Sequence, residues 1–442
     1  MNSYFIESFK VNKLWGYRSI NLTFHKDVNI LIGPNASGKT TILGIIHSIL
    51  ALDLPNLLNF NFNRAEIKLK GFKGRSVHTI TVKRDAADGF LELRLGQKRL
   101  PIRIDGISDR RFSERYSLSE RGSYSKSTFI RSAIELDIDI IRAEEFYDEF
   151  TALVPIVWLP VSRRLPVTDY EEERYTRTRT LESVDLRLEE LLEGLFHYHS
   201  RLNTLLSKRY KEFEHQVLSV ILYSKEHDQL DAIFGSMPSK LPTITKKEQL
   251  LGAFKAAGLL DDQMRARIHE HFAAAEEVLK RIDKSEKLSW DLKDILVIPL
   301  IYRTQAMVEY AGKLEEDREA IFDPLRRYED TVNSFLNDKS IKVDESGQLR
   351  IESPLQSHLN THHLSSGEKQ ILILLTQALL KVDEPVVYIA DEPELSLHVT
   401  WQEKLLESIV TLGGQKQIIV ATHSPDIVGK FRNNVITLGK EN

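Results

Sequence analysis

The chain has 442 residues, of which 42% are hydrophobic and 28% charged, and its formal net charge is −4. This composition predicts a soluble globular protein of two or three folding units. The charge gives no global basic signature for nucleic acid, although a local basic groove stays open. Cysteine is absent, which excludes disulfides, Cys-based zinc sites and thiol catalysis and favours a reducing cytoplasm. We find neither a signal-peptide pattern nor an apolar run of membrane-spanning length, so no membrane association is expected.

The N-terminal part, residues 1 to about 105, is predicted to be rich in strands. Its segments alternate apolar and polar residues, as half-buried strands do, and Gly71, Gly74 and Gly96 separate some of them. The last three segments predict an antiparallel meander. The expected strands are 5–11, 19–24, 66–70, 77–82 and 90–95, with a buried strand at 28–32 and a helix from 41 to 46.

The buried strand and the helix enclose a phosphate-binding loop that matches G-x-x-x-x-G-K-[ST]. Its residues are Gly33, Pro34, Asn35, Ala36, Ser37, Gly38, Lys39, Thr40 and Thr41. Glycines let the backbone turn its N–H groups toward phosphate oxygens, and the helix N-terminus adds its positive dipole end. Lys39 is expected to reach the β- and γ-phosphates, and the Thr40 hydroxyl to ligate Mg²⁺. The strand–loop–helix setting disfavours the alternative, a simple turn before a helix.

Residues 106 to about 131 are rich in serine and arginine. They are expected to form a solvated loop, and a nucleic-acid patch is the less favoured alternative. An acidic helix over 135–149 and a buried strand over 156–159 are predicted next.

A helical insertion is predicted from 168 to 338. Its first helix carries a heptad seam whose phase then slips by one residue. The seam fits an intrachain hairpin or an intersubunit contact, and we favour the intrachain packing because several predicted helices follow one another. Later helices are expected over 264–282, 292–314 and 321–335. The seam residues are Leu181, Val184, Leu188, Leu191, Leu195, Tyr198, Leu202 and Leu205, followed after the slip by Leu206, Tyr210, Phe213, Val217 and Val220.

After residue 338 the strand–helix rhythm returns. We expect a hairpin of strands 341–343 and 349–351, helices 369–381 and 401–412, and buried strands 386–390 and 417–421. The predicted fold class is therefore α/β: a P-loop nucleotide-binding fold split by a coiled-coil-like helical insertion. Its predicted parts are 1–167, 168–338 and 339–442.

Two acidic residues end the predicted strand 386–390. At the carboxyl end of a buried parallel strand, Asp391 can hold Mg²⁺. Glu392, one residue further, can polarise the water that attacks a γ-phosphate. His423 follows the strand 417–421 and should reach the same edge of the sheet, where a γ-phosphate contact is favoured over a structural role.

The segment Ser365, Ser366, Gly367 and Glu368 precedes a helix and fits the S-x-x-E capping box. A helix N-terminus with serine hydroxyls and N–H groups is also an anion site, so the capping reading and a phosphate-binding reading are compatible.

The ordered motifs GPNASGKTT, LSSGEKQ, VVYIADEPELSLH and VATHS resemble those of ATP-binding-cassette (ABC) ATPases of the RecF, SMC and Rad50 type. The resemblance covers about 1–105 and 340–442. It implies ATP and Mg²⁺ as cofactors, a catalytic role for Lys39, Glu392 and His423, and a head-to-head dimer. In that dimer, the signature residues 365–368 would complete the ATP site of a second copy, and 395–398 would be the D-loop. The expected Q-loop region, 158–164, contains no glutamine.

The helical insertion, together with LPVSRR and THSPDIV, is similar to ATPase subunits of bacterial anti-phage systems. Only 19 residues (442 − 423) follow His423, so a nuclease is expected on a separate chain. That arrangement resembles AriA of PARIS and, next, PtuA of Septu, which implies a homo-oligomeric ATPase regulating a Toprim-type or HNH-type nuclease, with a phage protein as a candidate trigger. The alternatives are a DNA-clamping ATPase in repair or chromosome maintenance and a nucleotide-binding scaffold with negligible turnover.

Overall fold

The structure is a computed structural model that describes residues 4–85, 90–103, 126–136, 138–151, 153, 155–159, 183–222, 247–256, 258–284, 292–354 and 356–439. By its internal contacts the chain divides into two compact units. The first unit combines Met1–Phe196 with Leu325–Asn442, and the second is His197–Pro324. Both boundaries fall inside long helices. The functional division at residues 167 and 338 stays a prediction.

An antiparallel sheet of six strands forms one layer of the first unit, in the order β2-β1-β4-β5-β6-β7. The predicted meander is confirmed, because β4, β5 and β6 pair antiparallel in sequence order. The sequence reading missed β7, which carries Pro101 and lies at the edge of the sheet, where proline is tolerated. The strands are β1 (Tyr4–Leu14), β2 (Arg18–Thr23), β4 (Arg64–Gly71), β5 (Val77–Asp85), β6 (Phe90–Leu95) and β7 (Lys98–Arg103).

A second sheet of five strands is entirely parallel, in the order β14-β3-β13-β12-β8. The predicted strand 28–32 is β3, and it lies between strands contributed by the C-terminal part of the chain. Buried residues fill β12 and β13 almost completely, as expected for a parallel sheet covered on both faces. The strands are β3 (Val28–Ile32), β8 (Ile156–Leu159), β12 (Val386–Asp391), β13 (Lys416–Ala421) and β14 (Val435–Thr437).

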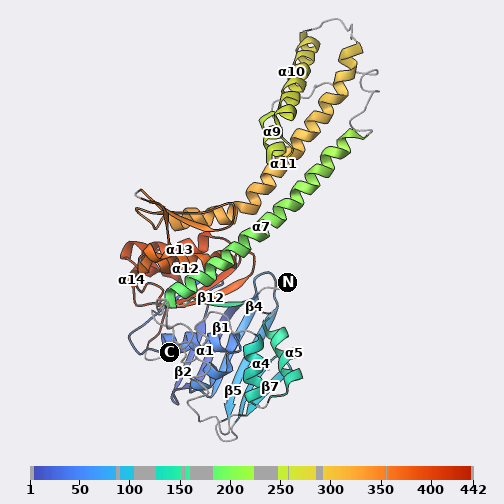
Figure 1. Ribbon diagram of the computed structural model, residues 1–442. Helices are drawn as coiled ribbons and strands as arrows, with labels where there is room; N and C mark the ends of the chain where they lie inside the picture. The colour runs from blue at the N-terminus through green and yellow to red at the C-terminus, as the bar shows by residue number, and fades with distance from the viewer. Residues whose placement is uncertain are drawn as a thin grey trace, which may run out of the picture. The chain divides into compact units, whose positions relative to one another are not determined.

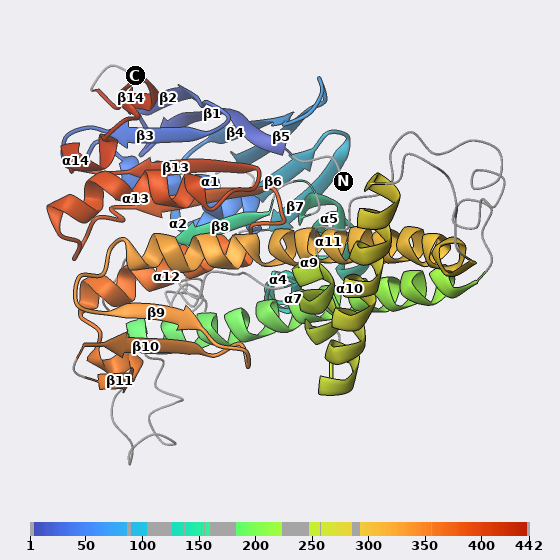
Figure 2. The same cartoon turned by 90° about the horizontal axis from the view of Figure 1, so that it is seen from above.

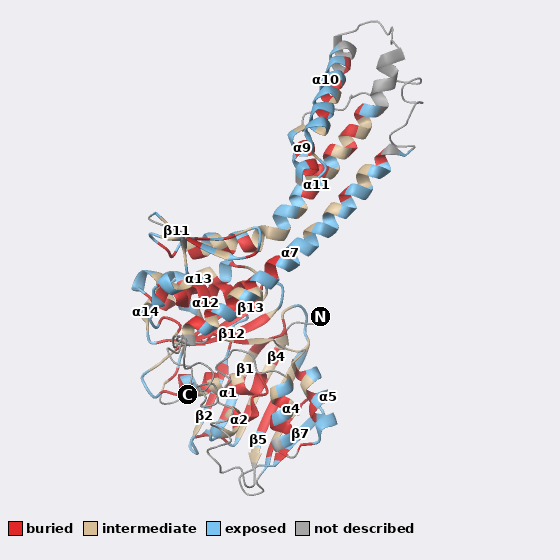
Figure 3. Cartoon of the chain, viewed as in Figure 1, coloured by how far each residue is buried: buried red, intermediate tan, exposed pale blue. Residues whose placement is uncertain are grey.

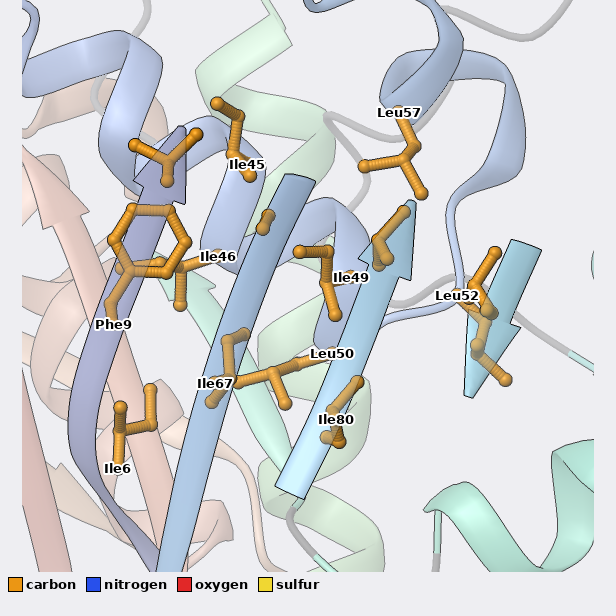
Figure 4. Packing of buried hydrophobic residues seen from close by; sticks show 14 of the residues in the cluster. Ile6, Phe9, Ile45, Ile46, Ile49, Leu50, Leu52, Leu57, Ile67 and Ile80 are labelled. Atoms are coloured by element: carbon orange, nitrogen blue, oxygen red, sulfur yellow. The ribbon is translucent and has the colours of Figure 1, made fainter. Parts of the chain in front are cut away.

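Helix α1 (Lys39–Leu50) packs between the two sheets. Figure 4 shows Ile45, Ile46 and Ile49 of this helix close to Phe9 and Ile67 of the antiparallel sheet. The same core cluster includes Val387 and Ile389 of β12. Three further helices, α2 (Leu54–Asn59), α4 (Lys126–Glu135) and α5 (Ile140–Thr151), belong to the layer beside the antiparallel sheet (Figure 1).

The other face of the parallel sheet is covered by α12 (Ser366–Leu380) and α13 (Val399–Thr411) (Figure 1). Tyr388 of β12 points to this side, since its hydroxyl donates to the carbonyl of Ala378 in α12. Successive side chains of a strand alternate between faces, and Val387 and Ile389 pack with α1. Helices α1 and α12 therefore lie on opposite faces of one sheet.

The region 106–149 differs in part from the expectation. Residues 126–131, predicted to be loop, form the first turns of α4, which ends at Glu135. The predicted helix over 135–149 is α5, which begins only at Ile140. The arginine- and serine-rich residues 104–125 lie outside the described part of the chain.

A small three-stranded sheet follows the insertion, in the order β11-β10-β9 (Figure 2). Its first two strands are β9 (Ser340–Val343) and β10 (Leu349–Ser353), which pair antiparallel and confirm the predicted hairpin. The third, β11 (Gln356–Leu359), was not predicted. A short helix α14 (Pro425–Val428) follows β13.

The second unit is helical and is built from parts of α7 (Ser183–Ile221) and α11 (Leu292–Asn333) with α9 (Lys247–Ala256) and α10 (Asp262–Lys284). The predicted seam on α7 is confirmed in part: Leu202, Phe213 and Val220 are buried, whereas Leu205, predicted as the last seam residue before the slip, is 43% exposed. Phe213 joins an apolar cluster with residues of α9, α10 and α11, so the seam packs within the chain there. Figure 3 shows buried positions among exposed ones on α7, α9, α10 and α11.

Two predicted helices, 292–314 and 321–335, are one helix in the structure. The expected break at 315–320 does not occur, because all but one residue of this polar run are good helix formers and an ion pair joins Arg318 and Glu315, one turn apart. Among the described helices, none is both long and apolar enough to cross a lipid bilayer.

Candidate nucleotide site

The phosphate loop connects the end of β3 to the first residue of α1, Lys39. Gly38 caps the helix with φ +97°, a left-handed conformation that favours glycine, and no side chain caps the first turn. A Cβ on Gly38 would lie 2.7 Å from Cη2 of Trp15, and one on Gly33 would lie 2.8 Å from the carbonyl oxygen of Leu438. Gly33 is thus required by space, and Gly38 by space and by conformation, and the uncapped N–H groups remain oriented for an anion.

Lys39 is buried and its ammonium group is held over this loop. Its Nζ donates to the carbonyl of Gly33 at 2.9 Å and to that of Pro34 at 3.3 Å. Burial lowers the pKa of Lys39, and the nearby carboxylates Asp391 and Glu392 act in the opposite direction. Cation and carboxylates therefore face the same small volume, the one to which the loop is open.

Thr40 and Asp391, the two predicted metal ligands, are adjacent. The Thr40 hydroxyl is hydrogen-bonded to the Asp391 carboxylate. Burial raises the pKa of Asp391, and the hydrogen bond from Thr40 opposes that effect. The Oδ1 atom of Asp391 is buried without a hydrogen-bond partner among the described residues. One hydroxyl and one carboxylate with a vacant oxygen suit Mg²⁺, a hard cation that takes oxygen ligands.

Glu392 and His423 come together because β12 and β13 are neighbours in the sheet. Oε1 of Glu392 lies 3.7 Å from Nε2 of His423. Glu392 adopts φ +50°, an uncommon left-handed conformation for a non-glycine residue, and its N–H donates to the carbonyl of Ala421 at 2.7 Å. Such strain persists only where the surrounding structure enforces it, and it is common at functional sites.

Glu394 is a site residue that the sequence reading missed. Its Oε1 accepts hydrogen bonds from the hydroxyl of Thr422 and from the backbone N–H groups of His423 and Ser424. The available signal was a third acid within four residues of a buried strand, which by itself is typical of a solvated turn. Only the pairing of β12 with β13 reveals its contacts.

The signature segment caps α12 as predicted. Oγ of Ser365 accepts from the N–H of Glu368, and Oε2 of Glu368 accepts from the N–H of Ser365 at 2.6 Å, so the capping box is confirmed. Ser365 and Ser366 are exposed, whereas Gly367 is buried. A Cβ on Gly367 would lie 2.9 Å from the carbonyl oxygen of Ser396, so the predicted D-loop passes directly beside the signature glycine.

The structure thus brings together the phosphate loop (residues 33–41), Asp391, Glu392 and His423 at the carboxyl ends of β3, β12 and β13. It does not connect the signature residues 365–368 with that group by any described contact. Helix α12, which they begin, covers the face of the sheet opposite to α1. Of the expected Q-loop region, residues 160–164 lie outside the described part of the chain.

Comparison with known proteins agrees with this geometry. A family model described as "AAA domain, putative AbiEii toxin, Type IV TA system" matches residues 189–429. The Retron Vc95 probable ATPase of Vibrio cholerae serotype O1 biovar El Tor is 20% identical over 94% of this chain and 69% of its own length. The peptidoglycan transport ATP-binding protein YejF of Agrobacterium fabrum is 27% identical over 35% of this chain and 30% of its own length.

Solved structures of Smc head domains also match. One from Pyrococcus furiosus, with an extended coiled coil bound to the C-terminal domain of ScpA, has 14% identity and a TM-score of 0.39, with 98% of this chain and 93% of that chain covered. One from Pyrococcus yayanosii, with a coiled coil and joint, has 16% identity and a TM-score of 0.37, with 98% and 95% covered.

The two sheets, the phosphate loop after β3 and the acids after β12 define an α/β P-loop ATPase of the ABC head type, split by a helical insertion, which is the predicted fold class. Because the family model spans more than half of the sequence, the chain belongs to the family of AAA domains described above.

Proposed function

We propose that this protein binds and hydrolyses ATP at the described site. The observation that carries the proposal is the convergence of Lys39, Thr40, Asp391, Glu392 and His423 at one edge of the parallel sheet. When bound there, Mg²⁺ would neutralise charge on the phosphate oxygens. Thr40 and Asp391 would hold it, and Lys39 would move from the loop carbonyls to the β- and γ-phosphates. Glu392 would accept the proton of the attacking water, and His423 would donate to a γ-phosphate oxygen.

The signature serines are proposed to act on the nucleotide of a second copy. The supporting observations are that α1 and α12 cover opposite faces of the same sheet and that no described contact joins Ser365 to the phosphate loop. A second copy would bring hydroxyls and the positive end of a helix to the open γ-phosphate and would exclude water from it. ATP would then hold two heads together until it is hydrolysed.

Mixing of inactive variants tests this arrangement. Lys39→Ala removes the phosphate-loop cation, and Ser365→Arg blocks the signature helix tip. Each variant alone should lack turnover. In a mixed dimer, one site carries both lesions and the other carries none, so mixing should restore measurable ATP hydrolysis. Failure of the mixture, when both variants still form dimers, would argue against a shared site.

We further propose that the ATPase is a homo-oligomeric sensor and scaffold that regulates a separate nuclease in anti-phage defence. Similarity over 94% of the chain to a protein named for a retron supports this direction. An AriA-like role predicts co-purification with a Toprim-type nuclease encoded nearby, and a PtuA-like role predicts an HNH-type nuclease. Purification of the tagged chain from its native host, with and without phage infection, would identify the nuclease and any phage trigger.

A second candidate function, direct contact with duplex nucleic acid, is favoured by one face of the antiparallel sheet. The strand register places eight basic and three acidic described side chains on this outer face. Each of the acids is within an ion pair on the same face, whereas Lys10, Lys68 and Lys83 form none with any side chain that the structure describes. The basic residues are Lys10, Arg64, Lys68, Lys70, Lys83, Arg94, Arg99 and Arg103, and the acidic ones are Glu7, Glu66 and Glu92.

Small polar side chains lie between these cations. A shallow hollow of about 250 Å³ on β1 and β2 is lined by Lys10, Asn12, Ser19, Ile20 and Asn21. The exposed large apolar residues of this face, Val77 and Phe90, lie at strand ends, so it lacks the apolar centre of a protein interface. Such a surface suits phosphate contacts without base readout.

The test is the salt dependence of duplex DNA binding by wild type and by Lys68→Glu/Lys83→Glu. Loss of two phosphate contacts should flatten the slope of log K against log salt by about 2. Lys342→Glu, on exposed β9 of the other small sheet, is the matched control. Equal slopes for all three proteins would remove this candidate.

A further inference from the structure

We propose that Glu394 is a positioning residue, which holds the loop bearing His423 at the correct distance from Glu392. The inference rests on the proposed ATPase function and deepens it. The side-chain carboxylate of Glu394, in the turn after β12, is hydrogen-bonded to the turn after β13. This contact adds to the backbone hydrogen bonds that pair the two strands.

The contacts are directed at three consecutive residues. The hydroxyl of Thr422 donates to Oε1 of Glu394, and so do the N–H groups of His423 at 3.2 Å and Ser424 at 3.3 Å. Thr422 is completely buried and Glu394 is 8% exposed. Several hydrogen bonds to one carboxylate oxygen, shielded from water, are stronger than the same bonds at a surface. They fix the backbone from which the imidazole of His423 projects.

The same short segment holds the base. Glu392 is two residues before Glu394, and its own N–H is bonded to the carbonyl of Ala421 on β13. The segments 392–394 and 421–424 are thus joined at both ends. Between those joints, Oε1 of Glu392 and Nε2 of His423 stand 3.7 Å apart. Glu394 touches neither of these groups, so it would act on them through the loop; its charge also acts on Asp391, whose pKa it raises.

The remaining oxygen of Glu394 gives the inference a second support. Oε2 is buried and has no hydrogen-bond partner among the described residues. A buried carboxylate oxygen without a partner is costly to folding. An apolar residue at this position would leave the three donors to Oε1 without an acceptor, and a glutamine would accept them only with a neutral oxygen. A carboxylate at this position is therefore consistent with a need for a strong hydrogen-bond acceptor at Oε1.

The experiment combines amide exchange with kinetics. In nucleotide-free protein, Glu394→Ala should accelerate hydrogen exchange in a peptide covering 420–428 and leave the phosphate-loop peptide unchanged. The kcat for ATP should fall by about 10- to 100-fold, as expected for a displaced reacting group, with KM within about threefold. Glu394→Gln keeps one acceptor oxygen and should recover part of the loss. Glu403→Ala, an exposed glutamate on α13, should match wild type. If Glu394→Ala fails to fold, Thr422→Val can replace it, because it removes the hydroxyl that donates to Glu394. Thr422→Ser keeps that hydroxyl and is its control.

A double-mutant cycle separates positioning from support of the fold. If Glu394 acts through His423, then Glu394→Ala should reduce kcat no further in a His423→Ala background. The proposal would be overturned if the kcat losses of Glu394→Ala and His423→Ala multiplied in the double variant. It would also be overturned if hydrogen exchange at 420–428 were unchanged, or if exchange in the phosphate-loop peptide accelerated equally. A wild-type protein that binds ATP without turning it over would refute the proposed hydrolysis instead, and the exchange data would still decide whether Glu394 holds the loop.

Discussion

Nζ of Lys369 lies 2.6 Å from Oδ1 of Asp185, and each side chain is only 11% exposed. Asp185 is in the first turn of α7, and Lys369 is in the first turns of α12. Lys339, directly before β9, pairs at 2.8 Å with Glu368, the neighbour of Lys369. Two consecutive residues near the start of α12 are therefore paired with the start of α7 and with the residue directly before β9.

Breaking the buried pair should destabilise the protein strongly. Asp185→Asn leaves the charge of Lys369 buried without its counterion, which costs about 3–5 kcal/mol of unfolding free energy. Urea denaturation measures this. The matched control is Glu407→Gln in the exposed pair with Lys430, 2.7 Å apart with side chains 49% and 76% exposed, where about 0–1 kcal/mol is expected. Similar losses of unfolding free energy for Asp185→Asn and Glu407→Gln would contradict the burial of the pair between Lys369 and Asp185.

Lys39→Ala should weaken ATP binding by about 10- to 100-fold, because it removes a charge-assisted contact to the phosphates. Thermal unfolding without nucleotide should change little, since the lost hydrogen bonds go to loop carbonyls. Titration with a fluorescent ATP analogue measures the affinity. Lys342→Ala, which removes an exposed cation far along the sequence from the loop, is the control, and equal affinities in both variants would show that the loop does not hold the phosphates through Lys39.

Glu392→Gln should bind ATP as well as wild type does but should lower kcat by about 100- to 10,000-fold, as expected when a general base is lost. The amide keeps the shape of the side chain and cannot accept the proton. ATP-bound oligomers should then persist, which size-exclusion chromatography with trapped nucleotide would detect. Wild-type turnover in this variant would show that another group is the base.

Lys416 should give a measurable pH dependence of stability. Burial, with a smaller effect of Arg327, lowers its pKa from 10.5 to about 8, and its Nζ donates to the carbonyl of Ile409 at 3.0 Å. Below pH 8 both folded and unfolded chains carry the proton, so the cost of burying the charge is complete. Between about pH 8 and 10.5 the folded state has released a proton that the unfolded state still binds, so the free energy of unfolding rises with pH.

Lys416→Met should abolish that rise and increase stability at pH 7 by roughly 1–2 kcal/mol, less than the full shift because the bond to Ile409 is lost. Urea denaturation at pH 7 and pH 9.5 checks both effects. Lys404→Met, at an exposed position on α13, should keep the pH dependence of wild type. An equal rise in the Lys416→Met protein would assign the effect to another group.

The sequence allowed the fold class and most strands to be predicted, because these depend on local patterns. The phosphate loop has a fixed spacing, and β3, β12 and β13 are short apolar runs. The edge strand β7 was hidden by Pro101, and β14 has only three residues, of which none is buried. Glu394 and Asp185 could not be assigned, because their partners are 28 and 184 residues away in the chain and only the folded sheet and helices bring them together. The roles of the site residues stay predictions until the variants are measured.

The order β14-β3-β13-β12-β8 also bears on how the chain is made. Strand β3 pairs only with β13 and β14 in the described sheet, and both are synthesised nearly four hundred residues later. While the ribosome translates the intervening segment, β3 and the phosphate loop exist with both strand edges open and with an apolar surface uncovered. Such edges pair readily with other chains. Newly made protein should therefore depend on chaperones until the last strands emerge, and translation stalled within the insertion should release aggregating fragments.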